Sequence, residues 1–241
     1  MIPATDEFKQ ACAEFGIELD LGEPEQLYAF LDVLYEANET TNLTAIRDES
    51  EAWMRHIFDA LTLLPVIAEL EPADGEQVRV CDVGSGGGVP AIPLAIVRPD
   101  VSFTMLEATG RKTALLEGFI GQLGLKNIRV VNARAERVGA FETGEMREQF
   151  DLVTARALGR ITVASELCVP LAREGGIIAL IKGQKAEEEL AEAKNAMHML
   201  HVGHTGTIDT PTGKIVILEK TRKTPKKYPR RDGEPKRAPL G

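Results

Sequence analysis

The stretch VCDVGSGGGVP, residues 80–90, decides the fold class of this 241-residue chain. A short apolar run ends in a loop with four glycines, and residues 90–97 then follow the pattern of a helix. In an open α/β fold such a loop lies at the carboxyl edge of the sheet, where ligands bind. Glycine lets a ligand approach the backbone without meeting a Cβ atom. The stretch therefore predicts an α/β sheet with a small-molecule site after one strand.

The spacing of the glycines narrows the class of ligand. A dinucleotide fingerprint would need a glycine in place of Val89, and a phosphate-binding P-loop would end in Gly-Lys-Ser/Thr, which this loop lacks. Residues 82–88 read DxGxGxG instead. Glu107, 23 residues beyond Gly84, is spaced to accept hydrogen bonds from ribose hydroxyls, and residues 132–136 would flank an adenine. We expect a nucleoside ligand; a glycine turn beside a surface glutamate is the alternative.

The rest of the chain alternates short apolar runs with helical patterns. Such alternation predicts a doubly wound, mostly parallel, twisted sheet. Residues 201–208 and 214–218 flank the turn DTPTG and suit a C-terminal antiparallel hairpin. We expect the other strands at 78–83, 101–106, 128–131, 151–154 and 177–181, and helices at 90–97, 111–123, 160–172 and 185–199.

Three regions follow from these patterns. Residues 1–75 form an N-terminal helical cap, residues 76–219 the core, and residues 220–241 a basic tail. The cap carries two apolar stripes at helical spacing, and Asp48 or Ser50 is a suitable N-cap for the second. The stripes are Leu27, Phe30, Leu31 and Leu34, and then Trp53, Ile57, Leu61 and Leu64.

The formal net charge of −9 argues against a nucleic-acid partner, since phosphate binding needs clustered cations. The sum conceals an asymmetry. Residues 220–241 carry nine Lys and Arg against two acids, a net +7, so residues 1–219 carry −16. With four prolines, the tail is expected to be extended and mobile.

Cys12, Cys81 and Cys168 are far apart and odd in number, which is typical of a reducing compartment and excludes a disulfide framework. The N-terminal residues lack the apolar core of a signal peptide, and no apolar run approaches the ~20 residues that cross a bilayer. We therefore expect a cytoplasmic protein without membrane segments. His198, His201 and His204 have no carboxylates or cysteines around them, so we expect no metal site.

Five cations are expected near the sheet edge that carries the glycine loop. Arg156 and Lys182 each follow an apolar strand. The alternative for Arg156 is a structural ion pair with Glu107 or Glu136, and the alternative for Lys182 is an ordinary surface position at the end of its strand. The other three are Arg111, Lys112 and Arg134; for Arg111 and Lys112 a solvated helix start is the competing interpretation, and His56 is expected to pack between helices.

Several segments together resemble one enzyme family. The glycine loop is similar to that of class I methyltransferases, which use S-adenosylmethionine. TNLTAIRD, RHIFDAL, GVPAIPL, TARA and LIKGQ, together with the ending YPRR…PK…PLG, resemble the bacterial RsmG (GidB) family. Family members commonly have Tyr where this chain has Thr41. The resemblance covers residues 25–220 and implies a Rossmann-like class I fold that methylates N7 of a guanine, position 527, in 16S ribosomal RNA.

The resemblance also implies which residues act. The expected cofactor-binding residues are Asp82, Gly84, Gly86, Gly88, Val89, Glu107, Ala108, Ala135, Glu136 and Arg156. Arg134, Arg156 and Lys182 are the candidate catalytic residues, and the candidate RNA contacts are Arg111, Lys112, Arg134, Lys182, Lys214, Arg230 and Arg231. Guanine N7 carries a free lone pair, so no general base is needed, and the enzyme mainly supplies proximity and orientation.

The expected partner is 16S ribosomal RNA or a small-subunit particle, and we expect the protein to act as a monomer. Two other classes stay open at this point. One is a methyltransferase acting on another RNA, a small molecule or a protein; the other is a non-catalytic module that binds an adenosine ligand or RNA. Equilibrium binding of S-adenosylmethionine separates the second class from a catalyst.

Overall fold

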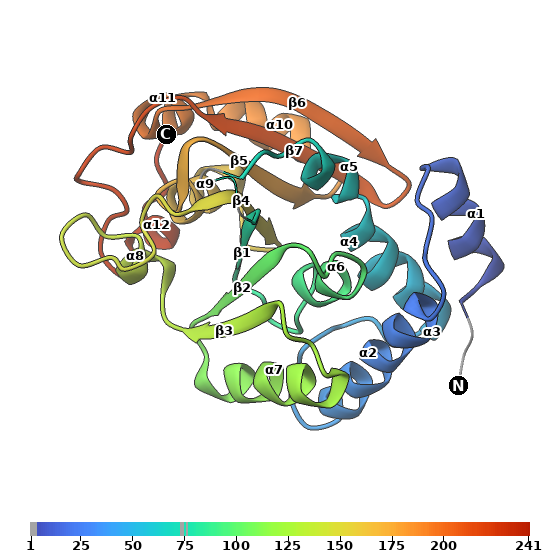
Figure 1. The fold of residues 1–241 in the computed structure, drawn as a ribbon. Helices are drawn as coiled ribbons and strands as arrows, with labels where there is room; N and C mark the ends of the chain where they lie inside the picture. The colour runs from blue at the N-terminus through green and yellow to red at the C-terminus, as the bar shows by residue number, and fades with distance from the viewer. Residues whose placement is uncertain (1–3, 73–74, 76) are drawn as a thin grey trace.

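The computed structural model describes residues 4–72, 75 and 77–241 and contains one seven-stranded sheet (Figure 1). The strand order is β3-β2-β1-β4-β5-β7-β6, parallel from β3 to β5 and antiparallel at β7 and β6. The strands are β1 Arg79–Val83, β2 Ser102–Glu107, β3 Ile128–Asn132, β4 Phe150–Arg156, β5 Ala172–Lys182, β6 Val202–Thr210 and β7 Gly213–Lys220. The expected α/β class, parallel sheet and C-terminal hairpin are confirmed.

The order of the strands decides where a ligand can sit. Strand β1 is hydrogen-bonded to β2 on one side and to β4 on the other. From β1 the chain continues to β2 and β3 on one side, and it then crosses to β4 on the other side of β1. The position between β1 and β4 is therefore the topological switch point, where open α/β sheets form a crevice. The glycine loop directly follows β1 and faces this crevice.

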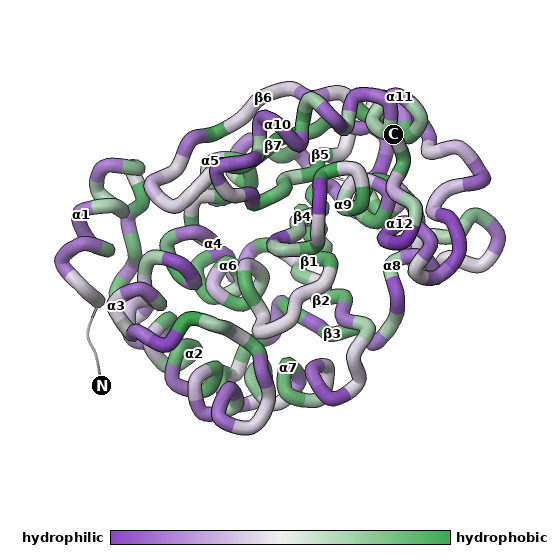
Figure 2. Tube along the Cα trace, turned by 180° about the vertical axis from the view of Figure 1, so that it is seen from behind, coloured by the Kyte–Doolittle hydropathy of each residue, from purple (hydrophilic) through white to green (hydrophobic). Residues whose placement is uncertain are grey.

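Helices cover both faces of the sheet. The N-terminal helices pack with α6 and α7 on one face, and α9 to α12 lie on the other (Figure 1). Hydrophobic residues gather along the central strands, while outward helix turns are hydrophilic (Figure 2). The core helices are α6 Ala91–Val97, α7 Gly110–Leu123, α8 Ala135–Val138, α9 Ile161–Cys168, α10 Ala186–Glu192, α11 Lys194–Leu200 and α12 Glu234–Arg237.

The N-terminal cap shares its core with the sheet. Phe8 packs on Trp53 with ring centroids 4.8 Å apart, and both belong to the same apolar cluster as Phe103 of β2. The Asp48 carboxylate accepts a hydrogen bond from the backbone N–H of Glu51 at 3.0 Å, as expected for an N-cap. The cap elements are α1 Asp6–Glu14, α2 Glu23–Asn38, α3 Glu49–Ala52, a π-helical turn Trp53–Phe58, α4 Asp59–Leu61 and α5 Leu64–Ala68.

Three expectations differ in detail. The helix expected over 160–172 ends at Cys168, and Ala172 already begins β5. The second cap stripe is divided, because Leu64 begins a separate helix, α5. The helix expected over 185–199 is two helices, α10 and α11, which meet at Ala193. The proposed boundary at residue 75 falls in a segment of which residues 73, 74 and 76 lie outside the described residues, and it stays a prediction.

The C-terminal tail differs from the expected extended chain. Its Tyr228 and Leu240 side chains are buried in the cluster formed by β4, β5 and α9. The Arg147 guanidinium donates hydrogen bonds to the carbonyls of Thr224 and Tyr228, at 2.7 and 2.8 Å. We expected an extended chain from the charge and proline content of the whole segment. In the structure, the buried side chains of Tyr228 and Leu240 and the hydrogen bonds from Arg147 attach the tail to the core.

An ion pair strengthens this attachment. Glu166 of α9 has no solvent exposure, and Arg230 donates hydrogen bonds to both of its carboxylate oxygens, at 2.8 and 2.6 Å. The backbone N–H of Arg230 donates a further bond to Glu166 at 2.9 Å. Such a forked arrangement is typical of a strong arginine–carboxylate pair. The guanidinium that we expected to contact RNA is therefore engaged by the protein.

We expect Arg230→Met to release the tail, because it leaves the Glu166 carboxylate buried without its charge partner. Breaking a buried pair in this way costs about 3 kcal/mol, which is roughly a 100-fold increase in the open population. Limited trypsin digestion measures this as faster cleavage within residues 222–237.

Arg231→Met is the matched control, since it removes a neighbouring trypsin site and an equal charge from an exposed side chain. It should leave the remaining cleavage rates unchanged. Equal rates in both variants would contradict the anchoring role of Arg230.

Candidate functional site

The loop after β1 makes a turn that only glycine fits well. Gly84 and Gly88 have φ values of +75° and +89°. A Cβ atom on Gly84 would lie 2.8 Å from Leu158 Cδ1, and one on Gly88 would lie 2.5 Å from Ile92 Cδ1. Side chains at these positions would thus be both strained and crowded. Gly86 also has a positive φ, +54°, but it is not crowded, because a Cβ atom there would meet only the carbonyl oxygen of Gly84, at 3.8 Å.

Glu107 holds this loop from the end of β2. Its carboxylate accepts hydrogen bonds from the backbone N–H groups of Gly86 at 3.1 Å and Thr109 at 2.8 Å. Asn132, at the end of β3, donates to the Glu107 carbonyl at 3.0 Å. The three strand ends that the sequence analysis singled out are therefore joined by hydrogen bonds at one edge of the sheet.

Asp82, the last acidic residue of β1, is a buried carboxylate with unused acceptor capacity. One oxygen accepts a hydrogen bond from the Thr154 hydroxyl at 3.1 Å. The other, Oδ2, has no partner within the described part of the chain. Burial raises the pKa of Asp82 to about 7, because the charged form loses its hydration. An orphan oxygen beside a glycine loop fits a site built to receive a cationic or hydrogen-bond-donating ligand.

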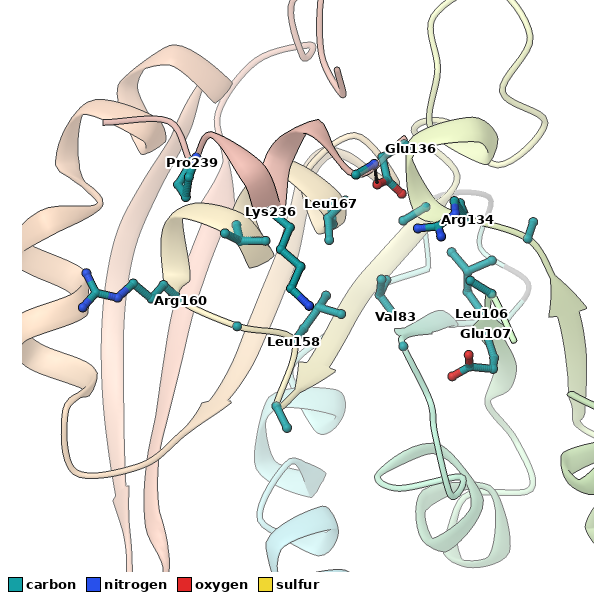
Figure 3. Close-up of a pocket in the computed structure, with 18 residues that line it drawn as sticks. Val83, Leu106, Glu107, Arg134, Glu136, Leu158, Arg160, Leu167, Lys236 and Pro239 are labelled. Carbon is teal, nitrogen blue, oxygen red and sulfur yellow. Dashed lines mark hydrogen bonds between the residues drawn. The ribbon is translucent and has the colours of Figure 1, made fainter. Parts of the chain in front are cut away.

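A cavity of about 590 Å³ opens at this edge (Figure 3). Its volume lies in the range of small-molecule sites, ~300–1,000 Å³. It brings together five of the expected cofactor residues: Gly84, Glu107, Ala108, Ala135 and Glu136. Asp82, Gly86, Gly88 and Val89 do not line it but form and support the adjoining loop.

A second cavity, about 430 Å³, lies on the other side of Ala157, which lines both. Its walls come from the N-terminal cap and from the carboxyl ends of β4 and β5. The charged and polar side chains in its lining are Thr44, Arg55, His56, Asp59, Thr62, Arg156, Lys182, Glu189, Thr210 and Thr212. Arg156 and Lys182, which we expected at this edge of the sheet, both line this cavity.

Arg156 joins the core to the cap. Its guanidinium donates a hydrogen bond to the backbone carbonyl of Arg55, approaches His56 Nδ1 at 3.3 Å and lies 4.0 Å from the Asp59 carboxylate. Only 24% of its side chain is exposed. The alternative ion pair with Glu107 or Glu136 is not what the structure shows; the acid beside Arg156 is Asp59, which the sequence analysis missed. Asp59 lies between Ile57 and Leu61, two residues of the second apolar stripe of the cap. No sequence signal relates it to Arg156, which is almost 100 positions away.

His56 relays this network to the loop over residues 41–46. Because Arg156 is a donor, His56 Nδ1 accepts, and Nε2–H donates to the Thr44 hydroxyl at 3.0 Å. Asn38 in turn accepts hydrogen bonds from the N–H groups of Leu43 and Thr44, at 2.8 and 3.0 Å. Burial and the nearby Arg156 charge lower the pKa of His56 to about 3, so the ring is neutral. The expected packing position of His56 is confirmed, with a polar role added.

The remaining expected cations vary in how much charge they present. Lys182 is only 11% exposed and lies 2.6 Å from Glu189, with a hydrogen bond to the Gly159 carbonyl at 2.5 Å. Lys214 lies between Asp209 and Glu187, at 2.5 and 3.1 Å.

The cations nearer the cap and the first cavity are more exposed. Arg111 donates to the Thr40 carbonyl at 2.8 Å, and half-buried Lys112 is its neighbour on α7. Arg134 lines the first cavity at 52% exposure, 3.8 Å from Asp232, and Arg231 is exposed. Their assignment to RNA stays a prediction.

Comparison with known proteins identifies the lineage of this site. The family model described as rRNA small subunit methyltransferase G matches residues 23–214. Ribosomal RNA small subunit methyltransferase G of Sorangium cellulosum is 43% identical over 93% of this chain and 91% of its own. The protein of the same name from Lactobacillus johnsonii is 38% identical over 97% and 98%. The chain belongs to the rRNA small subunit methyltransferase G family.

Solved structures agree on the fold. A putative S-adenosyl-L-methionine-dependent methyltransferase from Methanococcus maripaludis superposes with a TM-score of 0.52 at 16% identity, covering 82% of this chain and 94% of its own. A Corynebacterium glutamicum protein gives 0.55 at 15% identity, covering 90% and 97%. The fold is that of the S-adenosylmethionine-dependent methyltransferases of class I, as expected.

This membership explains why scattered segments were diagnostic. TNLTAIRD supplies Thr44, RHIFDAL supplies His56 and Asp59, and TARA supplies Arg156, which meet around the second cavity. The far wall of the first cavity was not predicted from the sequence. It consists of Leu158, Gly159, Arg160, Val163, Leu167, Gly233, Lys236 and Pro239, most of which are apolar or small residues with no signal of their own.

Two other properties concern the described residues only. No helix there is long and apolar enough to cross a membrane. Over the same residues, no three His, Cys, Asp or Glu side chains are grouped so that they could hold a metal ion. All three cysteines are free and buried, and burial raises the pKa of Cys12 to about 11.

We expect the neutral state of His56 to make stability depend on pH. Its pKa is lower in the folded protein than the ~6.5 of an unfolded chain, so acid favours unfolding as pH falls from about 6.5 toward 3. This contribution amounts to about 2 kcal/mol between pH 7 and pH 5.

The test compares His56→Gln with the unaltered protein by urea unfolding at both pH values. The variant has lost hydrogen bonds at either pH, but it cannot lose stability by protonation. The gap in unfolding free energy should therefore narrow by about 2 kcal/mol at pH 5. A gap that is the same at both pH values would contradict the neutral, buried assignment.

Proposed function

We propose that this protein transfers a methyl group from S-adenosylmethionine to N7 of a guanine, position 527, in 16S ribosomal RNA of the small subunit. The observation that carries the proposal is a pair of adjoining cavities at the switch point of a methyltransferase fold, in a member of this family. One cavity has the features of a nucleoside site, and the other is lined by cations and cap residues. We place the reaction in the cytoplasm, with the protein acting as a monomer.

The first cavity fits the adenosine part of the cofactor. Glu107 offers carboxylate oxygens to ribose hydroxyls, and Ala108, Ala135 and Glu136 border the space for adenine. Gly84 lines the cavity beside Glu107, and a Cβ atom on Gly86 would meet only the Gly84 carbonyl oxygen, at 3.8 Å, which leaves room beside this loop for the rest of the cofactor. The residues present therefore fit S-adenosylmethionine.

When bound, the cofactor supplies a methyl group on a positively charged sulfur, which suits in-line displacement by a lone pair. The chain's own residues then have to orient the guanine. Arg156 is placed for this, since it faces the second cavity at the carboxyl end of β4 and is fixed by Arg55, His56 and Asp59. The buried Asp59 carboxylate balances its charge, which limits repulsion with a positively charged product.

The remaining cations are proposed as RNA contacts that position rather than react. Arg111, Lys112, Arg134 and Arg231 are better suited to phosphates than Arg230, whose guanidinium is held by Glu166. Lys182 is paired with Glu189 in the lining of the second cavity, and Lys214 is paired with Asp209 and Glu187, which do not line it. They would have to exchange these partners for phosphate oxygens when RNA binds.

Gly86→Asp is expected to abolish S-adenosylmethionine binding while the protein stays folded. The Cβ atom of the new residue lies 3.8 Å from its nearest neighbour, and Asp is among the residues that tolerate the positive φ of this position, so the fold is kept while the carboxylate occupies space beside the loop. Isothermal titration calorimetry should show at least a ~100-fold weaker Kd, the effect of placing a side chain and a charge in a close-fitting site.

Gly124→Asp at the end of α7 is the control, because Gly124 also has a positive φ, +67°, and a Cβ atom there meets nothing within 4 Å, but it lies outside both cavities. It should bind the cofactor normally. If Gly86→Asp also binds normally, the assignment of the loop is wrong.

Arg156→Ala is expected to lower kcat/KM for methylation by about 100-fold, the effect of losing precise orientation of a reacting group. Far-UV circular dichroism should show a retained fold. Arg98→Ala removes an arginine paired with Asp100, outside both cavities, and should keep full activity. Full activity of Arg156→Ala would refute the role.

Methyl transfer to purified small-subunit particles and to naked 16S RNA, with the modified nucleotide mapped, tests the whole proposal. Modification of guanine 527 at N7 supports it. A product at another nucleotide, or only on a small molecule or protein, would replace it with the alternative methyltransferase assignments.

A further inference from the structure

The C-terminal segment forms one side of the cavity proposed for the cofactor. Gly233, Lys236 and Pro239 line it together with residues that follow β1, β2, β3 and β4, so residues 233–239 complete a wall that the sheet edge alone does not supply. Figure 3 shows the Lys236 side chain running from α12 into this space toward Leu158, with Glu107 on the far side.

Direct hydrogen bonding fixes the segment to the site. The backbone N–H of Gly233 donates to the Glu136 carboxylate at 2.8 Å, and Glu136 is one of the residues placed around the adenine. Asp232 pairs with Arg137 of α8 at 2.7 Å and lies 3.8 Å from Arg134, the residue that precedes α8. These contacts orient the Glu136 carboxylate and place the negative charge of Asp232 near the positive charge of Arg134.

The anchoring is stronger than a surface tail requires. Arg230 precedes α12 in the chain and pairs with the fully buried Glu166. Leu240 follows α12 and is itself buried. These two attachments bracket residues 233–239 and leave them little freedom to move away from the cavity. Because a preorganised wall lowers the entropic cost of binding, such anchoring favours a ligand-binding element.

We propose that residues 233–239 are a cofactor-binding element, in which the Lys236 ammonium donates a hydrogen bond to the adenosine part of the ligand. Glu136 is positioned by Gly233. The inference rests on the cofactor site proposed above. It assigns the basic tail a second role, separate from contact with RNA.

Lys236→Met and Arg237→Met form a matched pair of variants. Both remove one exposed cation from the same short helix, but only Lys236 lines the cavity. We expect Lys236→Met to raise the Kd of both S-adenosylmethionine and S-adenosylhomocysteine about fivefold, the effect of losing one charge-assisted hydrogen bond near solvent. Arg237→Met should change neither Kd by more than about twofold.

The two ligands separate a contact from a general charge effect. Removing any nearby cation should favour the positively charged S-adenosylmethionine over S-adenosylhomocysteine, whereas a lost contact to the shared adenosine weakens both alike. Equal effects of the two variants, or unchanged Kd values for Lys236→Met, would overturn the inference.

Protection of the unaltered protein provides a second measurement. Saturating S-adenosylhomocysteine should slow trypsin cleavage after Lys236 and Arg237 and leave cleavage after Lys223 unchanged, because Lys223 is exposed outside the cavity. Cleavage after Lys236 and Arg237 at unchanged rates would count against the element. If the unaltered protein bound neither ligand, the proposed function would fail; if it bound both and only these tests failed, the site would stand without its C-terminal wall.

Discussion

The turn from β1 into α6 is the constraint on which the site depends. Gly84 and Gly88 hold positive φ values where a Cβ atom would press on Leu158 and Ile92. Because the turn lies between β2 and β4 in the sheet, its backbone faces the crevice formed at the switch point. The Glu107 carboxylate accepts a hydrogen bond from the backbone N–H of Gly86, so the same turn orients the carboxylate that we assign to the ribose.

A second dependence runs from the cap to the core. Arg156 is the last residue of β4, and its partners Arg55, His56 and Asp59 all belong to the cap helices. His56 passes this connection to Thr44 in the loop that borders the second cavity. The cap is therefore part of the site, since the placement of Arg156 requires an acid and acceptors that the sheet does not supply.

The tail shows how charge and burial act on the same segment. Its net positive charge suits RNA, but Tyr228, Leu240 and the Arg230–Glu166 pair attach it to the core. The expectation of an extended chain failed because composition averages over the segment, whereas attachment depends on a few side chains. The alignment of the helix α12 with the first cavity follows from those anchors.

The sequence by itself determined the α/β class, the glycine loop, the strand-end positions of Glu107 and Arg156, and the family resemblance, because these follow from local periodicity and from residues close together in the chain. Only the tertiary structure decided that Asp59 lies beside Arg156 and that Lys236 and Pro239 close the first cavity. Asp59 and Arg156 are 97 positions apart, and Lys236 is 78 positions from Leu158, which lines the same cavity. These contacts depend on strand order, on how the cap docks and on where the tail is anchored, none of which leaves a local pattern.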